Sequence, residues 1–87
     1  MNENMIQSKK ELEQALNEYN NTKQAYEDAI DNQKDYKEVV DNMEIAEEKM
    51  FNEAYKFYDT LRTNEENLTE SELVENWKLF RQFFETV

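Results

Sequence analysis

The chain contains neither glycine nor proline in its 87 residues. These two residues are the usual breakers of helices and the usual makers of tight turns. The sequence also lacks the alternation of apolar and polar residues that is typical of strands, and it is rich in helix-forming Glu, Lys, Gln, Ala and Leu. We therefore expect an all-α protein that is helical along nearly its whole length.

The same composition excludes several kinds of functional site. Cysteine and histidine are also absent, so the chain cannot form disulfides, thiolate or imidazole metal sites, or Ser-His-Asp triads. Without glycine it cannot form a P-loop, a dinucleotide-binding turn or a standard EF-hand loop. Its carboxylates fall on the polar faces of the expected helices, where they are solvated. A carboxyl that acts in acid–base catalysis is usually shielded from water. We expect no catalytic residues, no metal and no cofactor, and hence no enzyme activity.

Three helices are expected, at about residues 8–32, 35–62 and 70–87. The first is predicted to begin at Ser8, which forms a capping box with Glu11. Residues 1–7 would then be a flexible N-terminus, and residues 8–87 a single all-helical domain. One apolar stripe follows along the first helix, formed by Leu12, Leu16, Tyr19, Tyr26 and Ile30.

The second and third helices carry stronger signals. The second has a wide apolar face, formed by Met43, Ala46, Met50, Ala54, Phe57 and Leu61. The third is predicted to start with a capping box between Thr69 and Glu72. Its expected core seam consists of Leu73, Trp77, Phe80, Phe84 and Val87. The polar segment 62–67 between these helices is expected to be a loop.

The first connection has three interpretations. A turn at 31–35 would use Asp35 and Glu38 as cap and box partner, and a turn at 40–45 would use Asp41 and Glu44. The third interpretation is a stutter in one continuous helix, which would be about 80 Å long and would need a dimer to bury its stripe. The architecture is thus a small three-helix bundle, or a helical hairpin plus a C-terminal helix. The alternative is a long helix in a dimeric coiled coil.

The chain is strongly acidic, with 21 Asp and Glu against 10 Lys and Arg and a net charge of −11. Such a surface repels nucleic acids and anionic membranes and attracts basic proteins. We expect as partner a protein with a basic surface, for example a nucleic-acid-binding one, besides a homodimer if the long helix forms. No signal peptide or membrane-spanning run is visible, so the expected location is the cytoplasm, or the host cytoplasm if a phage encodes the chain.

An acidic ladder runs through the middle of the sequence at steps of three or four residues. Its members are Asp28, Asp31, Asp35, Glu38, Asp41, Glu44 and Glu48. Residues so spaced are neighbours about 5–6 Å apart on a helix, close to the spacing of phosphates along a nucleic acid strand. The ladder is interpreted either as a solvated face that keeps the protein soluble, or as a partner-binding face that imitates DNA.

Aromatic residues are in surplus on the last two expected helices. Tyr55, Tyr58 and Phe83 lie off the main apolar stripes, so we expect them to form a partner-binding surface. We expect the chain to act as a non-enzymatic acidic protein-binding module. The most specific version of this prediction is an inhibitor or anti-defence protein of the type that phages and plasmids encode. It would occupy a nucleic-acid-binding surface of its target. The Asn-, Lys-, Glu- and Tyr-rich sequence fits such an AT-rich genome.

One short motif suggests an alternative. The segment from Tyr55 to Asp59 resembles the Y-x-x-x-D pattern of helical-hairpin substrates of type VII secretion. Members of that family usually carry W-x-G in their central turn, whereas Trp77 here is followed by Lys78 and Leu79 and lies in another predicted helix. The resemblance implies a structural or secretion-related hairpin that acts through helix–helix association.

Overall fold

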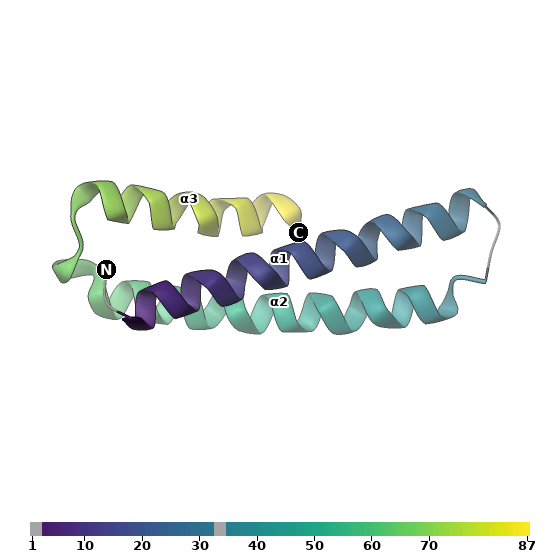
Figure 1. Ribbon diagram of the computed structural model, residues 1–87, viewed down its shortest axis with the longest axis horizontal. Coiled ribbons are helices and arrows are strands. Elements are labelled where there is room, and N and C mark those ends of the chain that lie inside the picture. Colours follow the sequence, from purple (N-terminus) through teal and green to yellow (C-terminus); the bar gives the residue numbers. More distant parts are fainter. Residues whose placement is uncertain (1–2, 33–34) are drawn as a thin grey trace.

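A computed structural model describes residues 3–32 and 35–87 and contains three α-helices, with no strand among these residues. Helix α1 (Glu3–Asp31) and helix α2 (Lys37–Asn64) form an antiparallel hairpin. A short 3₁₀ helix, η1 (Glu65–Asn67), leads from there into α3 (Glu70–Thr86). Figure 1 shows that α3 lies along only one half of the hairpin. The structure confirms the expected all-α fold as a helical hairpin plus a C-terminal helix.

Two ion pairs of the same kind cross from α1 to α2. Lys49 Nζ lies 3.1 Å from Glu18 Oε2, and Lys56 Nζ lies 3.3 Å from Glu11 Oε2. The two glutamates are separated by seven residues, and so are the two lysines. The same Glu–Lys pairing therefore repeats after one heptad along this side of the hairpin, as in an antiparallel coiled coil.

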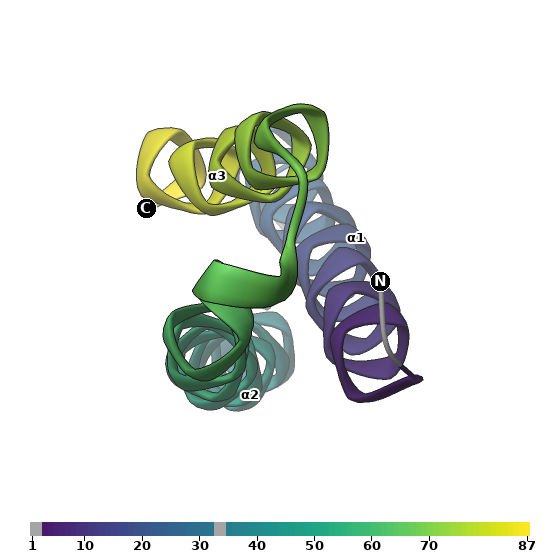
Figure 2. The ribbon, with the colours of Figure 1, turned by 90° about the vertical axis from the view of Figure 1, so that its left-hand side faces the viewer.

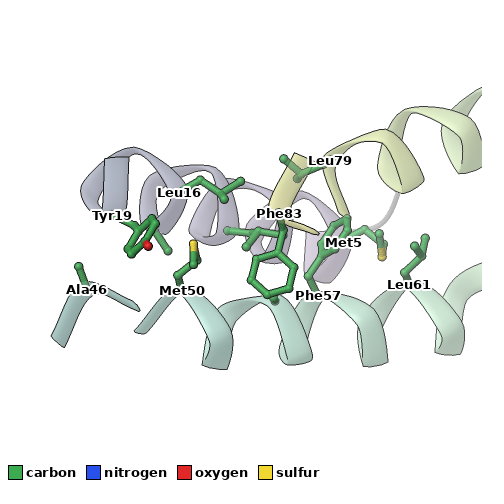
Figure 3. Packing of buried hydrophobic residues seen from close by; sticks show 12 residues of the cluster. Met5, Leu16, Tyr19, Ala46, Met50, Phe57, Leu61, Leu79 and Phe83 are labelled. Atoms are coloured by element: carbon green, nitrogen blue, oxygen red, sulfur yellow. The ribbon is translucent and has the colours of Figure 1, made fainter. Parts of the chain in front are cut away.

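The core of the protein fills the seam between α1 and α2 beneath α3. On α1 its members recur at steps of three and four residues, namely Met5, Ser8, Leu12, Ala15 and Tyr19. The facing side of α2 supplies Ala46, Met50, Ala54, Phe57 and Leu61, and α3 adds Leu79 and Phe83. Figure 3 shows side chains from all three helices meeting in this cluster. Burial of these residues is the main stabilising contribution to the fold.

The chain turns between α1 and α2 at the first of the predicted positions. Asn32 closes the end of α1, because its backbone N–H and its Nδ2 both donate to the Asp28 carbonyl oxygen, at 3.0 and 2.7 Å. Asp35 prepares the start of α2 by accepting from the Lys37 backbone N–H at 3.1 Å. The predictions of a turn at 40–45 and of one continuous helix are therefore wrong, since α2 runs through residues 40–45 without a break.

The predicted start of the first helix is also wrong. Helix α1 already begins at Glu3, and residues 3–7 belong to it rather than to a flexible N-terminus. Ser8 lies inside the helix, where its side chain is buried. The physical reason is Met5, which is fully buried in the core, so tertiary packing extends the helix beyond its local capping signal. Residues 1–2 of the predicted flexible segment lie outside the described residues.

Helix α3 begins as predicted but is rotated relative to its predicted seam. The capping box between Thr69 and Glu72 is present. The buried residues of the helix are Asn76, Leu79 and Phe83, whereas Phe84 and Val87 are exposed. Figure 2 shows α3 lying above both α1 and α2. Its buried face includes Leu79 and Phe83 of the second apolar ridge, and Phe84 and Val87 of the predicted seam lie outside it. Asn76 is tolerated there because its Nδ2 donates to the Glu72 carbonyl oxygen.

The end of the hairpin that α3 does not cover has almost no core. We call residues 20–32 and 35–48 the free end; within them only Ala29 and Ala46 are buried. Ile30, predicted to lie on the core stripe, is 47% exposed. Two helices alone have only one narrow face to bury, so this end gains little from apolar burial.

The hydroxyl groups of Ser8 and Thr69 give a first prediction. Ser8 Oγ is buried and has no hydrogen-bond partner among the described residues, whereas Thr69 Oγ1 accepts from the Glu72 backbone N–H at 3.2 Å. We expect Thr69→Ala to lower the free energy of unfolding by about 1 kcal/mol. Ser8→Ala should leave it unchanged or raise it by up to about 1 kcal/mol, because it removes an unsatisfied buried group. Urea denaturation followed by circular dichroism measures both; an equal loss in Ser8→Ala would contradict the helix start at Glu3.

A second prediction concerns pH. Hydrogen bonds from Gln7 and from Lys56 hold the pKa of Glu11 below its ordinary value of 4.5. A carboxyl whose pKa is lower in the folded state stabilises that state at neutral pH, and this contribution is lost as the pH falls through the folded-state value. The stability difference between the wild type and Glu11→Gln should therefore be present at pH 7 and shrink below pH 4.5. A difference that is constant across this range would contradict it.

Candidate protein-binding surface

The acidic ladder predicted from the sequence gathers at the free end of the hairpin. Asp28 and Asp31 lie on α1, Asp35 lies in the connection, and the other members lie on α2, namely Glu38, Asp41, Glu44 and Glu48. All seven side chains are exposed. The hairpin in Figure 1 thus brings both arms of the ladder to the same end of the molecule.

None of the seven ladder carboxylates forms an ion pair with a described residue. The ion pair nearest to them in the chain is Lys49 with Glu18, at the border of the free end. Two ladder residues accept weaker local bonds: Asp28 from Gln24 Nε2 and Asp35 from the Lys37 backbone N–H, both at 3.1 Å. The negative charge of this end is therefore left open to solvent or to a partner.

Much of the net charge lies in the same region. The sequence from residue 20 to 48 contains nine acidic residues and three lysines, which gives −6 of the total −11 in a third of the chain. Charges gathered at one end of an elongated body produce a stronger local potential than the same charges spread evenly. The free end is one of two strongly anionic regions, since residues 65–75 contain five glutamates and no basic residue.

The ladder does not follow one helix face, and so it does not form the straight line of charges that its spacing suggests. The turn divides it into two antiparallel arms. Along α2, the step from Glu38 to Glu44 turns the side-chain direction by about 120°, given 100° per residue in a helix. The carboxylates form an anionic cap around the hairpin end rather than a copy of one phosphate backbone.

The three predicted aromatic residues have different surroundings. Tyr55 is 67% exposed on α2. Tyr58 is half-buried between the helices, with its ring centroid 6.2 Å from that of Trp77 and 5.6 Å from that of Phe80. Phe83 is only 5% exposed, and Figure 3 shows it pointing from α3 into the core. The prediction that Phe83 is a partner-binding residue is therefore wrong, because the rotation of α3 makes it a core residue.

The same rotation exposes an aromatic residue that sequence reasoning placed in the core. Phe84 is 64% exposed and contacts Phe80 and Phe83 through its ring, at centroid distances of 4.9 and 5.4 Å. Tyr55 lies on α2 between Phe51 and Tyr58, both of which contact rings of α3. We call Tyr55 and Phe84 the aromatic edge. The sequence does contain a signal for the exposure of Phe84. Leu79 and Phe83 form a second apolar ridge on α3, and when that ridge is buried Phe84 is left exposed.

Other chemistry finds little support in the described part of the chain. No group of three or more acidic side chains in residues 3–32 and 35–87 is arranged to hold a metal ion. A depression between α1 and α3 is open to solvent and lined by charged and polar side chains around Leu79. None of the described helices combines the length and the apolar character needed to cross a membrane.

Comparison of the chain with protein-family models, with curated proteins and with solved structures finds no match. The function of the chain must therefore be inferred from the charge, exposure and packing of its own residues. Among these, the anionic free end and the aromatic edge are two exposed features that the core of the described residues does not require.

The contrast between two neighbouring phenylalanines gives a third prediction. We expect Phe83→Ala to lower the free energy of unfolding by about 3–5 kcal/mol, because it removes a buried ring from the core. Phe84→Ala should lower it by less than about 1 kcal/mol, because most of that ring is already in water. Thermal and urea denaturation of the two variants measure the difference. The reverse order would show that the seam predicted from the sequence, with Phe84 inside, is the correct one.

Proposed function

We propose that this protein is a non-enzymatic, acidic protein-binding module whose free end binds a basic surface of a partner protein. The observation that carries the proposal is the set of seven exposed ladder carboxylates, which form no ion pair with any described residue. A basic partner would supply the missing cations, and attraction between opposite surfaces would speed its encounter with this end.

The distribution of charge favours binding over solubility alone. Acidic residues three or four positions apart on a helix repel one another and reduce its stability. Here the repulsion falls on the end of the hairpin that has almost no core. A basic partner would offset this repulsion, so binding would stabilise the free end.

The sharper form of the proposal makes the target a nucleic-acid-binding protein. Basic surfaces that bind nucleic acid carry clustered Lys and Arg, which are complementary in charge to the ladder carboxylates of the free end. A protein that covers such a surface acts as an inhibitor, in the manner of anti-defence proteins from phages or plasmids in a host cytoplasm. The exposed rings of Tyr55 and Phe84 would add apolar contact area.

The alternative drawn from the Y-x-x-x-D motif has less support. The α1–α2 hairpin agrees with it, but Trp77 lies on α3, where its ring packs against Tyr58, and not at the turn between the two long helices. The motif residues Tyr55 and Asp59 lie within α2. We therefore prefer the acidic binding module.

Charge reversal at the free end tests the proposal. The tagged wild type captures partners from an extract of the producing organism or its host, and the binding of each purified partner is then measured by calorimetry. We expect Asp35→Lys, Glu38→Lys and Asp41→Lys together to weaken that binding by at least about tenfold, which is 1.4 kcal/mol. The affinity should also fall steeply as salt rises, and nucleic acid should compete for the partner.

A matched control carries the same change of net charge at the covered half. Glu13, Asp59 and Glu66 are exposed acidic residues outside the ladder, and their reversal to lysine should change the affinity by less than about twofold if only the free end binds. Equal losses in the two triple variants, or binding that does not respond to salt, would contradict the proposal.

A further inference from the structure

The free end has little apolar burial to hold its two helices together. Its buried residues, Ala29 and Ala46, have small side chains, and Tyr26 and Met43 are only partly buried. The half of the hairpin that α3 covers in Figure 1, which we call the covered half, buries large side chains such as Phe57 completely. Apolar burial offsets the entropy that is lost when a helix pair becomes ordered, and this contribution is smallest at the free end.

The two helix termini at the free end are weakly stabilised. Helix α1 has Asp28 and Asp31 in its last turn and no basic residue there, although the negative end of the helix dipole favours cations. Helix α2 begins after Tyr36, whose side chain makes no capping hydrogen bond, and Asp35 supplies one bond, from the Lys37 backbone N–H. Helix α3 in the covered half starts instead with a complete capping box.

Ionic attraction between α1 and α2 stops at the border of the free end. The two pairs that cross between these helices, Lys49 with Glu18 and Lys56 with Glu11, lie outside residues 20–48. Within the described part of the free end no ion pair forms, and the ladder carboxylates repel neighbours three or four positions away. Electrostatic interactions therefore contribute to the closed hairpin in the covered half and oppose it at the free end.

We infer that the free end opens as a local unit while the covered half stays folded, and that positive charge closes it. Little burial, weak helix termini and uncompensated repulsion coincide in the same residues, and such a segment opens at a lower free energy than the whole fold. Dissolved cations close it by screening the repulsion. Basic side chains of a partner close it by neutralising the carboxylates, and only this last step rests on the proposed function.

Amide hydrogen exchange, measured residue by residue by NMR at constant pH, tests the opening. At about 10 mM NaCl, amides near Ala29 and Ala46 should exchange at least about tenfold faster than amides near Leu12 and Phe57, after correction for their intrinsic rates. Raising NaCl to about 1 M shortens the Debye length from about 30 Å to about 3 Å and should narrow this difference at least about threefold. Equal exchange in the two halves, or a difference that salt leaves unchanged, overturns the inference.

Two pairs of substitutions with the same change of net charge locate the repulsion. Asp28→Asn with Asp31→Asn removes two carboxylates from the end of α1, and the Asn side chain keeps the oxygen that accepts from Gln24 Nε2. We expect this pair to slow exchange in the free end at least about threefold at low salt. Glu13→Gln with Asp59→Asn, in the covered half, should change it by less than about twofold. Equal effects of the two pairs would show that the total charge governs the opening, and would overturn the inference.

An oligolysine peptide separates the opening from the binding of a partner. At an ionic strength matched with NaCl, we expect the peptide to slow exchange in the free end at least about threefold more than in the covered half. Equal slowing in both halves overturns the free end as the place where positive charge acts. Closure by salt without any effect of oligolysine supports the opening and contradicts the proposed function instead.

Discussion

The third helix is shorter than the pair on which it packs, and most other features of the molecule depend on this mismatch. Helix α3 has 17 residues, against 29 in α1 and 28 in α2. Where it covers the hairpin, three helices enclose a core that runs from Met5 and Leu61 at one end to Tyr19 and Met50 toward the middle of the hairpin. Where it does not, two helices bury only Ala29 and Ala46. One half of the hairpin therefore provides stability, and the other half exposes side chains that the core does not use.

The helices themselves could be predicted because local signals agree with tertiary packing there. Thr69 and Glu72 form the predicted capping box. At the start of α2 the prediction of Asp35 as N-cap with Glu38 as box partner is wrong, because the N-cap is Tyr36 and Asp35 only accepts from the Lys37 backbone N–H. The start of α1 could not be predicted in the same way, because the local signal at Ser8 competes with burial of Met5. A capping interaction contributes about 1 kcal/mol, whereas a buried methionine contributes about 2 kcal/mol or more, so packing prevails.

The candidate site was predicted in part, for a related reason. The acidic ladder could be read from spacing alone, but its final shape depends on a turn that no glycine or proline marks. The roles of Phe83 and Phe84 were exchanged because both lie on apolar ridges of α3, about 100° apart around the helix. Which ridge faces inward depends on where the groove between α1 and α2 lies, and the sequence of α3 alone does not contain that information.

The free end carries charges that would be a disadvantage in the isolated protein. Uncompensated carboxylates destabilise a helix pair with little core, and such ends open more readily than the rest of a fold. A basic partner surface would offset this repulsion, and the attraction between opposite charges would speed the encounter. Because the core lies under α3 at the other half, the free end can carry these charges without loss of the fold.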